Sequence, residues 1–251
     1  MSWSNVRVAA LLFPPYLIWL GFAATSNYTV WKMNPATFRS AEGLPTAMAR
    51  RFTCQPDAAG FPDKAAWEKS PALHFEKDWK GENADPGRST EVRLLWTPDT
   101  LYVRFQANFR TITVFRDARG DGWRDELWNR DVAEVFLQTD SRNPWKYKEF
   151  EVSPNGFWID LDIANGGKEE LRSKLRRSVV QNAVEKTWTA DLAIPMRSLT
   201  LDFDAKQAWR VNFFRVEGEV EPRFYSAWSP TYTPQPNFHV PGAFGKLVFL
   251  E

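Results

Sequence analysis

A tryptophan and a glutamate lie close together near the middle of the chain, in an arrangement that suits contact with a sugar. Residues 131–138 alternate in character, which predicts a strand with Ala133 and Val135 on one face and Glu134 on the other. Trp128 stands just before this strand, where the chain would leave a loop. An indole ring can stack on the C–H face of a sugar while a carboxylate accepts hydrogen bonds from its hydroxyls. The same residues also suit a structural role, with Trp128 in the core and Glu134 paired with an arginine.

A second strand that carries carboxylates is predicted to follow. Residues 147–153 alternate, which places Glu149 and Glu151 on the same face of the strand. If this strand pairs with residues 131–138, Glu134 shares a sheet face with both of them. That face would then carry several carboxylates, whose chemistry has two interpretations.

The first interpretation is general acid/base catalysis, because glycosidases place two carboxylates on either side of the bond that they break. In that case Glu134 and Glu149 would be the acid/base pair. The second interpretation is a polar, concave face with Arg104 and Arg215 as counter-ions. The distance between the carboxylates, which the fold determines, separates the two interpretations.

A loop rich in proline and aromatic residues is predicted at residues 228–245. Its prolines restrict the loop before binding, so its aromatic side chains lose less conformational entropy when they contact a ligand. Phe238 and His239 are the candidate contacts on this loop. A structural, hydrogen-bonded histidine is the alternative interpretation of His239.

Composition argues against several other classes of function. The chain of 251 residues has 32 basic and 31 acidic residues, so its net charge of +1 gives no reason to expect a nucleic-acid partner. Its two histidines and one cysteine do not form a zinc motif. No phosphate-binding glycine-rich loop or nucleophile elbow occurs. The chain has 13 Trp, a number that favours some rings at a binding surface.

The surrounding segments predict an all-β, antiparallel β-sandwich, because apolar and polar residues alternate in short runs separated by proline and glycine. The predicted strands are 91–96, 101–107, 131–138, 147–153, 157–163, 188–194, 209–213 and 246–250. Residues 25–59 are predicted to be an irregular extension, and residues 168–177 a weakly helical or polar excursion. Asp160 and Asp162 alternate outward and are expected on a solvated face, where calcium is a further option.

Residues 1–24 have the layout of a secretory signal peptide. The short start carries one positive charge, residues 8–24 are uncharged and mostly apolar, and small residues follow. An uncleaved membrane anchor is the alternative, although Pro14 and Pro15 would interrupt its helix. We therefore expect export to the periplasm or the extracellular space, with membrane contact only through an uncleaved segment.

Several short motifs, in order along residues 60–251, resemble those of the family 9 carbohydrate-binding modules. The motifs are Leu94-Leu95-Trp96, Leu101-Tyr102-Val103, Leu127-Trp128-Asn129-Arg130-Asp131-Val132-Ala133-Glu134-Val135-Phe136, Tyr147-Lys148-Glu149-Phe150-Glu151-Val152-Ser153-Pro154-Asn155-Gly156, Ala193-Ile194-Pro195, Trp209-Arg210-Val211-Asn212-Phe213, Trp228-Ser229-Pro230 and Pro241-Gly242-Ala243-Phe244-Gly245. The resemblance implies a β-sandwich of jelly-roll or immunoglobulin-like type at residues 60–251, often with structural calcium. It also implies an exported, non-catalytic protein that binds an oligo- or polysaccharide.

The same resemblance implies roles for individual residues. In members of the family two aromatic rings clamp the reducing-end sugar, and Trp128 falls on the first of these positions. Phe238 falls on the second, where sugar-binding members usually have Trp. Glu134 matches a residue that hydrogen-bonds sugar hydroxyls, and Glu151 stands where some members have Arg. The predicted ligand-binding residues are Trp128, Glu134, Glu149, Phe238 and His239.

Two other functions remain as alternatives to a binding module. One is the glycoside hydrolase described above, and the other is haem binding. Relatives of this sandwich hold haem through axial Met or Lys, and Met196 follows the Ala193-Ile194-Pro195 motif. The oligomeric state is not predicted.

Overall fold

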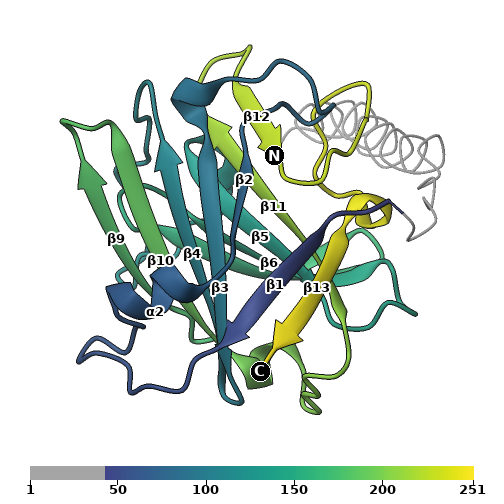
Figure 1. Ribbon diagram of the computed structural model, residues 1–251. Helices are drawn as coiled ribbons and strands as arrows, with labels where there is room; N and C mark the ends of the chain where they lie inside the picture. The colour runs from purple at the N-terminus through teal and green to yellow at the C-terminus, as the bar shows by residue number, and fades with distance from the viewer. Residues whose placement is uncertain (1–42) are drawn as a thin grey trace, which may run out of the picture. The chain divides into compact units, whose positions relative to one another are not determined.

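The structure is a single β-sheet that curls back on itself (Figure 1). The computed structural model describes residues 43–251, in which thirteen strands join in one sheet. In chain order the strands are β1 (Thr46–Arg51), β2 (Ala72–Phe75), β3 (Thr90–Thr97), β4 (Thr100–Asn108), β5 (Val132–Gln138), β6 (Lys146–Val152), β7 (Trp158–Ala164), β8 (Gly167–Glu170), β9 (Arg176–Asn182), β10 (Thr187–Pro195), β11 (Trp209–Glu217), β12 (Phe224–Ala227) and β13 (Gly245–Leu250). The short helices are α2 (Lys64–Lys69) and α3 (Met196–Leu199), with 3-10 helices η1 (Pro86–Arg88), η2 (Leu127–Asn129) and η3 (Pro241–Ala243).

The two halves of the curled sheet pack face to face and enclose the main core. Across the sheet the strands follow the order β8-β7-β6-β5-β11-β13-β1-β3-β4-β10-β9. The half that holds β4 and β10 packs over the half that holds β5 and β11 (Figure 1). Between them, the rings of Phe105 and Phe213 meet edge to face with their centroids 6.2 Å apart. The all-β prediction is confirmed, and the curled sheet has the two packed layers of a sandwich.

Most of the strands that alternation predicts are present, and the turn between the first two of them is held as expected. Thr97 ends β3 and its hydroxyl oxygen accepts hydrogen bonds from the backbone N–H groups of Asp99 and Thr100. Trp96 then pairs with Leu101 across the hairpin. A threonine followed by Pro-Asp therefore reverses the chain as turn chemistry predicts.

Strand β1 lies within the segment for which irregular structure was predicted, residues 25–59. It lies between β13 and β3 and runs parallel to both. Strand β1 therefore joins the last strand of the chain to the strands that follow β1 in the sequence. Ala47 and Ala49 face the core and are 1% and 0% exposed. Two alanines give little hydrophobic signal, so the pairing partners rather than the local sequence determine this strand. The part of the extension before residue 43 lies outside the described residues.

Two further predictions are wrong, namely the helical character of residues 168–177 and the solvated position of Asp160. Residues 168–177 are not helical, because they contain strand β8 and the start of β9. Asp160 is not solvated: it is 0% exposed, faces the core, and its carboxylate accepts a hydrogen bond of 2.6 Å from the backbone N–H of Ser173. Asp162 is partly exposed and forms an ion pair with Lys148. A period of two separates the faces of a strand, but in this sheet both faces of β7 are covered.

The site is built on the sheet face that points away from the main core, which we call the outer face of β5, β6, β7 and β11. Val132 and Phe136 of β5 lie on it, together with Phe214 of β11. The chain segment 228–244 folds over these residues, and Phe238 and Phe244 pack against them. The outer face is therefore a second hydrophobic core, with room for a pocket where polar side chains interrupt it.

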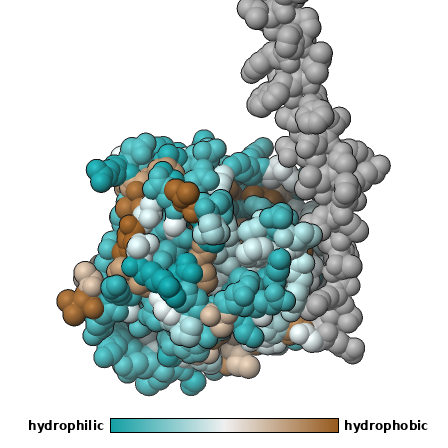
Figure 2. All heavy atoms as spheres, turned by 90° about the horizontal axis from the view of Figure 1, so that it is seen from above, coloured by the Kyte–Doolittle hydropathy of each residue, from teal (hydrophilic) through white to brown (hydrophobic). Residues whose placement is uncertain are grey.

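The predicted signal segment, residues 1–24, lies outside the described residues. Across residues 43–251, no helix is long and apolar enough to cross a membrane. The surface seen from above in Figure 2 is largely hydrophilic, with small separate apolar patches. Isolated apolar residues of this kind are normal on a folded domain.

Core packing between the two halves predicts a large difference between two leucine substitutions. Leu94 of β3 is 1% exposed in the main core, whereas Leu201 is 90% exposed. We expect Leu94→Ala to lower the free energy of unfolding by about 2–5 kcal/mol, because it removes buried methyl groups and leaves a cavity. Leu201→Ala is the matched control, with an expected change within about 0.5 kcal/mol in urea unfolding. Equal losses in the two variants would contradict the packing described here.

Candidate functional site

Three glutamates from adjacent strands meet on the outer face. Glu134 of β5 lies directly opposite Glu151 of β6 in the antiparallel register, and Glu149 lies opposite Phe136. One carboxylate oxygen from each glutamate lies within 4.8 Å of the corresponding oxygens of the other two. The predicted pairing of residues 131–138 with 147–153 is therefore confirmed, and we call these three glutamates the acidic cluster.

The acidic cluster is buried, and much of its hydrogen-bonding capacity is unused. Glu134 and Glu149 are 2% exposed and Glu151 is 0% exposed. Within the described part of the chain, both oxygens of Glu151 and one oxygen of each other glutamate have no hydrogen-bond partner. An unpartnered polar group in a protein interior costs about 1–3 kcal/mol, and more when it is charged. These oxygens are therefore available to a ligand.

Burial and mutual repulsion favour the protonated forms of two members of the cluster. The pKa of Glu134 is raised well above its ordinary value, first by burial and then by the neighbouring charge of Glu149. The pKa of Glu151 is also raised well above its ordinary value by burial, and then by the charges of Glu134 and Glu149. Like charges directly opposite each other on paired strands repel, so the cluster must share protons or receive a cation.

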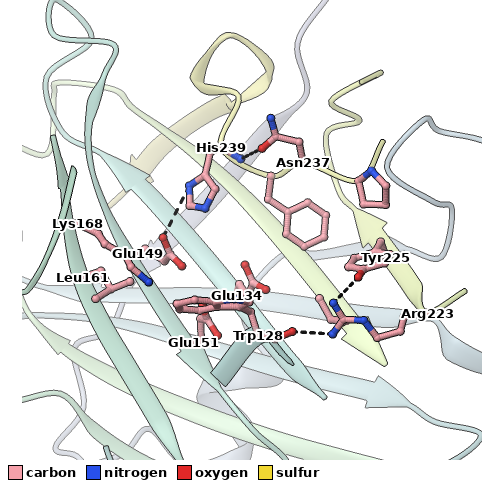
Figure 3. Close-up of a pocket in the computed structure, with 13 residues that line it drawn as sticks. Trp128, Glu134, Glu149, Glu151, Leu161, Lys168, Arg223, Tyr225, Asn237 and His239 are labelled. Carbon is pink, nitrogen blue, oxygen red and sulfur yellow. Dashed lines mark hydrogen bonds and ion pairs between the residues drawn. The ribbon is translucent and has the colours of Figure 1, made fainter. Parts of the chain in front are cut away.

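The acidic cluster forms part of the lining of a pocket of about 200 Å³. Trp128, on the 3-10 helix η2, provides one aromatic wall (Figure 3). Phe238, on the 228–244 segment, also lines the pocket. His239 lies beside Glu149 at the same opening. The predicted ligand-binding residues therefore all line one pocket, although they come from three separate parts of the chain. Their role as ligand contacts stays a prediction.

The two aromatic walls differ in how tightly they are packed and how exposed they are. Phe238 is 9% exposed and stacks on Phe214, with ring centroids 4.2 Å apart and planes 13° apart. Its ring also meets Tyr225 edge to face at 6.2 Å. Trp128 is partly exposed, so more of its ring is open to the pocket. Phe238 is thus a fixed wall, and Trp128 is the larger available plate.

His239 is held by its neighbours while its ring remains accessible. Its Nδ1 lies 2.7 Å from the hydroxyl of Tyr147 and 3.9 Å from a carboxylate oxygen of Glu149. Its backbone N–H donates to the side chain of Asn237. The side chain is 53% exposed, so the imidazole can contact both the acidic cluster and a ligand at the opening.

The cations of the pocket are not the predicted ones. Lys168, on the hairpin strand β8, places its ammonium 4.0 Å from the centre of the Trp128 ring (Figure 3). Arg223 lies on the pocket wall, where it donates to the backbone carbonyl of Trp128 and pairs with Glu221. Lys168 lowers the pKa of Glu151 against the effect of burial, which shows that its charge reaches the acidic cluster.

Arg104 and Arg215, the predicted counter-ions, both point elsewhere. Arg104 forms a two-bond ion pair with Asp191 of β10. Arg215 is 0% exposed and faces the main core, where it pairs with Glu217 and lies over the ring of Trp188. Arg215 was assigned to the acidic face on sequence grounds, but the β11 register puts it opposite Ala133, on the inner side.

The sequence-based list of ligand residues omitted three charged side chains that line this pocket, namely Glu151, Lys168 and Arg223. Glu151 follows the same alternation as Glu149, so the strand pattern already contained its signal. Lys168 and Arg223 lie on short hairpin and loop segments, which reach the pocket only through the pairing of β8 with β7 and of β12 with β11. No local pattern marks them.

The acidic cluster is also the only group of potential metal ligands found among residues 43–251. Carboxylate oxygens suit calcium, which takes six to eight oxygen ligands. The other walls, however, are aromatic rings and the ammonium of Lys168, which would repel a divalent cation. The pocket therefore fits a structural calcium ion poorly, and calcium elsewhere in the domain stays a prediction. Met196, the haem candidate, is 2% exposed inside the main core, away from this pocket.

A concave pocket with an indole wall and inward-facing carboxylates, on one face of a β-sandwich, defines a small-molecule-binding module. The chain belongs to the carbohydrate family 9 binding domain-like family, whose model matches residues 60–251. The predicted resemblance to the family 9 modules is thereby confirmed.

Individual relatives agree with this assignment. An extracellular protein of the fungus Arthroderma benhamiae is 26% identical over 195 residues, which cover 71% of this chain and 85% of that protein. A solved structure from Bacteroides uniformis has a TM-score of 0.64 at 15% identity, covering 81% of this chain and 98% of that one. A family 9 carbohydrate-binding module from Caldicellulosiruptor kristjanssonii, solved with cellotriose and with glucose, has TM-scores of 0.60 and 0.59 at 14% identity. The cellotriose structure covers 82% of this chain and 94% of that one. At these identities the three solved structures show that the fold is shared with this chain.

The raised pKa values in the acidic cluster predict how stability depends on pH. A carboxyl group whose pKa is higher in the folded state favours folding below its unfolded pKa, and that contribution is lost as pH rises. Glu151→Gln replaces the carboxyl with a neutral group of similar shape. We therefore expect its melting temperature to exceed that of the unmodified chain at pH 8. The expected rise is about 2–4 °C for each kcal/mol by which the free energy of unfolding increases. The difference should shrink at pH 4.5.

Glu185→Gln is the matched control for this experiment, because Glu185 is exposed on the turn between β9 and β10. Its melting temperature should follow that of the unmodified chain across the same pH range in differential scanning calorimetry. If Glu151→Gln also followed it, the cluster would not carry the shared protons described above.

Proposed function

We propose that this chain is an exported, non-catalytic carbohydrate-binding protein that holds a saccharide in the pocket of Trp128 and the acidic cluster. The observation that carries the proposal is the meeting of an available indole plate with inward-facing carboxylates, in a chain of this family. Sugar recognition needs both, since the ring has an apolar face and a polar edge.

In the proposed mode of binding, the sugar ring lies between Trp128 and Phe238. Glu134, Glu149 and His239 accept or donate hydrogen bonds at its hydroxyls. Stacking on one good ring contributes on the order of 1 kcal/mol beyond the buried area. With a small number of hydrogen bonds, such a site gives micromolar to millimolar affinity, or roughly −8 to −4 kcal/mol.

The proposed mode requires one rearrangement. The ammonium of Lys168 lies 4.0 Å from the centre of the Trp128 ring, so it must move aside before a sugar stacks there. Lys168 lies on an exposed hairpin strand, and 48% of its side chain is accessible. A lysine side chain in such a position changes rotamer on a nanosecond timescale, so this movement is no barrier to binding.

The geometry of the acidic cluster supports a binding function over hydrolysis. In glycosidases the two carboxylates flank the bond that is broken. Here Glu134 and Glu149 come from neighbouring strands and lie on the same floor of the pocket, with oxygens within 4.8 Å. A bond held above that floor would meet both groups from one side.

Export is proposed on two grounds. Residues 1–24 have the charge and hydrophobicity layout of a signal peptide, and the relative from Arthroderma benhamiae is an extracellular protein. The binding domain would then meet saccharides outside the cytoplasm, where polysaccharides occur.

The proposed clamp predicts end-specific binding. Calorimetric titration of the chain with xylo- and cello-oligosaccharides should show binding that disappears when the reducing end is converted to an alditol, because the opened sugar no longer offers a flat ring. Binding that survives reduction would mean that the pocket contacts internal units. No heat with any saccharide would contradict the proposed function.

Removal of the indole plate should abolish this binding. We expect Trp128→Ala to lose detectable binding, with a circular dichroism spectrum like that of the unmodified chain. Trp145→Ala is the matched control, because Trp145 precedes β6 and is not among the residues that line the pocket. Affinity that stays the same in Trp128→Ala would rule out this site.

A binding module should release no reducing sugar from xylan or cellulose, since it lacks a step that cleaves the glycosidic bond. A standard reducing-sugar assay on the purified chain tests this directly. Release that Glu149→Gln removes would instead support the hydrolase interpretation.

A further inference from the structure

The acidic cluster is richer in negative charge than a neutral sugar requires. Glu134 and Glu151 face each other across paired strands at 2% and 0% exposure, and Glu149 completes the group. A hydroxyl can donate one hydrogen bond to a carboxylate, but it does not offset the charge. Buried carboxylates in such proximity are stabilised by protons or by a cation.

The unpartnered oxygens of Glu151 are a second observation that points to a ligand. Both carboxylate oxygens of Glu151 are fully buried, line the pocket and have no hydrogen-bond partner in the described residues. A carboxylate with two free oxygens can accept several hydrogen bonds, and an ammonium group has three N–H donors to supply them.

An ammonium already occupies part of this pocket. The Nζ of Lys168 lies over the face of Trp128 at 4.0 Å, a typical cation–π distance, and its charge acts on Glu151. The closest carboxylate that the structure gives Lys168 is that of Asp125, at 3.9 Å, which is a weak ion pair at the surface. The combination of an indole face and a buried carboxylate is therefore suited to an amine. The Lys168 ammonium is only weakly fixed in this position.

The other charged groups of the pocket act on members of the cluster other than Glu151. Arg223 is engaged by the carbonyl of Trp128 and by Glu221, and its charge lowers the pKa of Glu134. His239 contacts Tyr147 and lies 3.9 Å from Glu149. Glu151 therefore has the carboxyl group of Glu149 beside it, but no cation donates a hydrogen bond to it within the described residues.

The aromatic walls and the size of the pocket argue for an organic ligand. Trp128, Phe238 and Tyr225 surround a space of about 200 Å³, on the scale of one sugar ring. A divalent metal ion would leave most of that space unfilled.

We propose that the pocket selects a saccharide that carries a free amino group, such as a glucosamine unit, with its ammonium held by Glu151 and Glu134. The sugar ring takes the place of the Lys168 ammonium over Trp128. This inference rests on the proposed carbohydrate-binding function and names the class of saccharide that the same site prefers.

Proton linkage follows from this arrangement. Burial raises the pKa values of Glu134 and Glu151 and so favours their protonated forms, whereas a bound ammonium favours their charged forms. Binding of the amino sugar should therefore release protons, and its affinity should rise with pH until the amine itself loses its charge. The other titratable or charged groups that face the pocket are Glu149, Tyr147, Lys168, Arg223, Tyr225 and His239.

The direct test is calorimetry on the full chain with matched saccharides, namely chitosan disaccharide with free amines, its N-acetylated form and cellobiose. We expect the free-amine disaccharide to bind about ten- to hundredfold more tightly than the other two, because charge-assisted hydrogen bonds are the stronger ones. Titration in two buffers of different ionisation enthalpy should show proton release for the amine only.

Two variants assign the preference to residues. Glu151→Gln should bring the affinity ratio between free-amine disaccharide and cellobiose close to one, while cellobiose still binds. Glu185→Gln, at an exposed turn, should keep the ratio of the unmodified chain. Lys168→Ala should raise the affinity for the free-amine disaccharide severalfold by removing the internal competitor, whereas Lys64→Ala on α2, 88% exposed, should not.

The outcomes separate this inference from the proposed function. Equal binding of all three disaccharides would overturn the amine preference and leave the carbohydrate function standing. No binding of any saccharide would overturn both. Saturable calcium binding that Glu151→Gln removes, with no binding of the free-amine disaccharide, would show that the cluster holds a metal ion instead.

Discussion

The buried pairing of Glu134 with Glu151 is the constraint on which the site depends. Two carboxylates directly opposite each other on adjacent strands repel, and their burial removes the water that would screen them. The fold retains this pair together with Glu149, and leaves several of their oxygens without a partner in the described residues. Such an arrangement is costly unless protons or a ligand neutralise it. The cost falls on the outer face of the sheet, where the pocket of Trp128 and the acidic cluster lies.

The rest of the domain holds that pocket rigid. The inner faces of β5, β6 and β11 pack on the opposite half of the sheet, and their outer faces are covered by segment 228–244. Phe238 stacks on Phe214, so the covering segment is anchored beside the acidic cluster. A ligand therefore meets a preformed wall, which reduces the entropy lost on binding. Lys168, with 48% of its side chain accessible, is free to adjust.

Alternation in the sequence predicted the strands of the site well, and it predicted which side chains share a face. Glu134, Glu149 and Glu151 lie together as expected, because the period of two is a local property of a strand. It misplaced Asp160 and Arg215, which face the core with exposures of 0%. Period alone does not tell which face is buried, and in this curled sheet both faces of the central strands are covered. Strand β1 was missed because its parallel neighbours come from distant parts of the chain.

By itself, the sequence determined the all-β class, the family motifs, and the residue types that can contact a sugar. These follow from local patterns, in which each residue acts through its neighbours along the chain. Only the tertiary structure decided that Trp128, Phe238 and His239 surround the acidic cluster, and that Lys168 rather than Arg104 supplies the nearby cation. Those relations depend on strand register and on the path of a long covering segment. Both are set by packing between residues far apart in sequence. Local sequence patterns carry no information about such contacts.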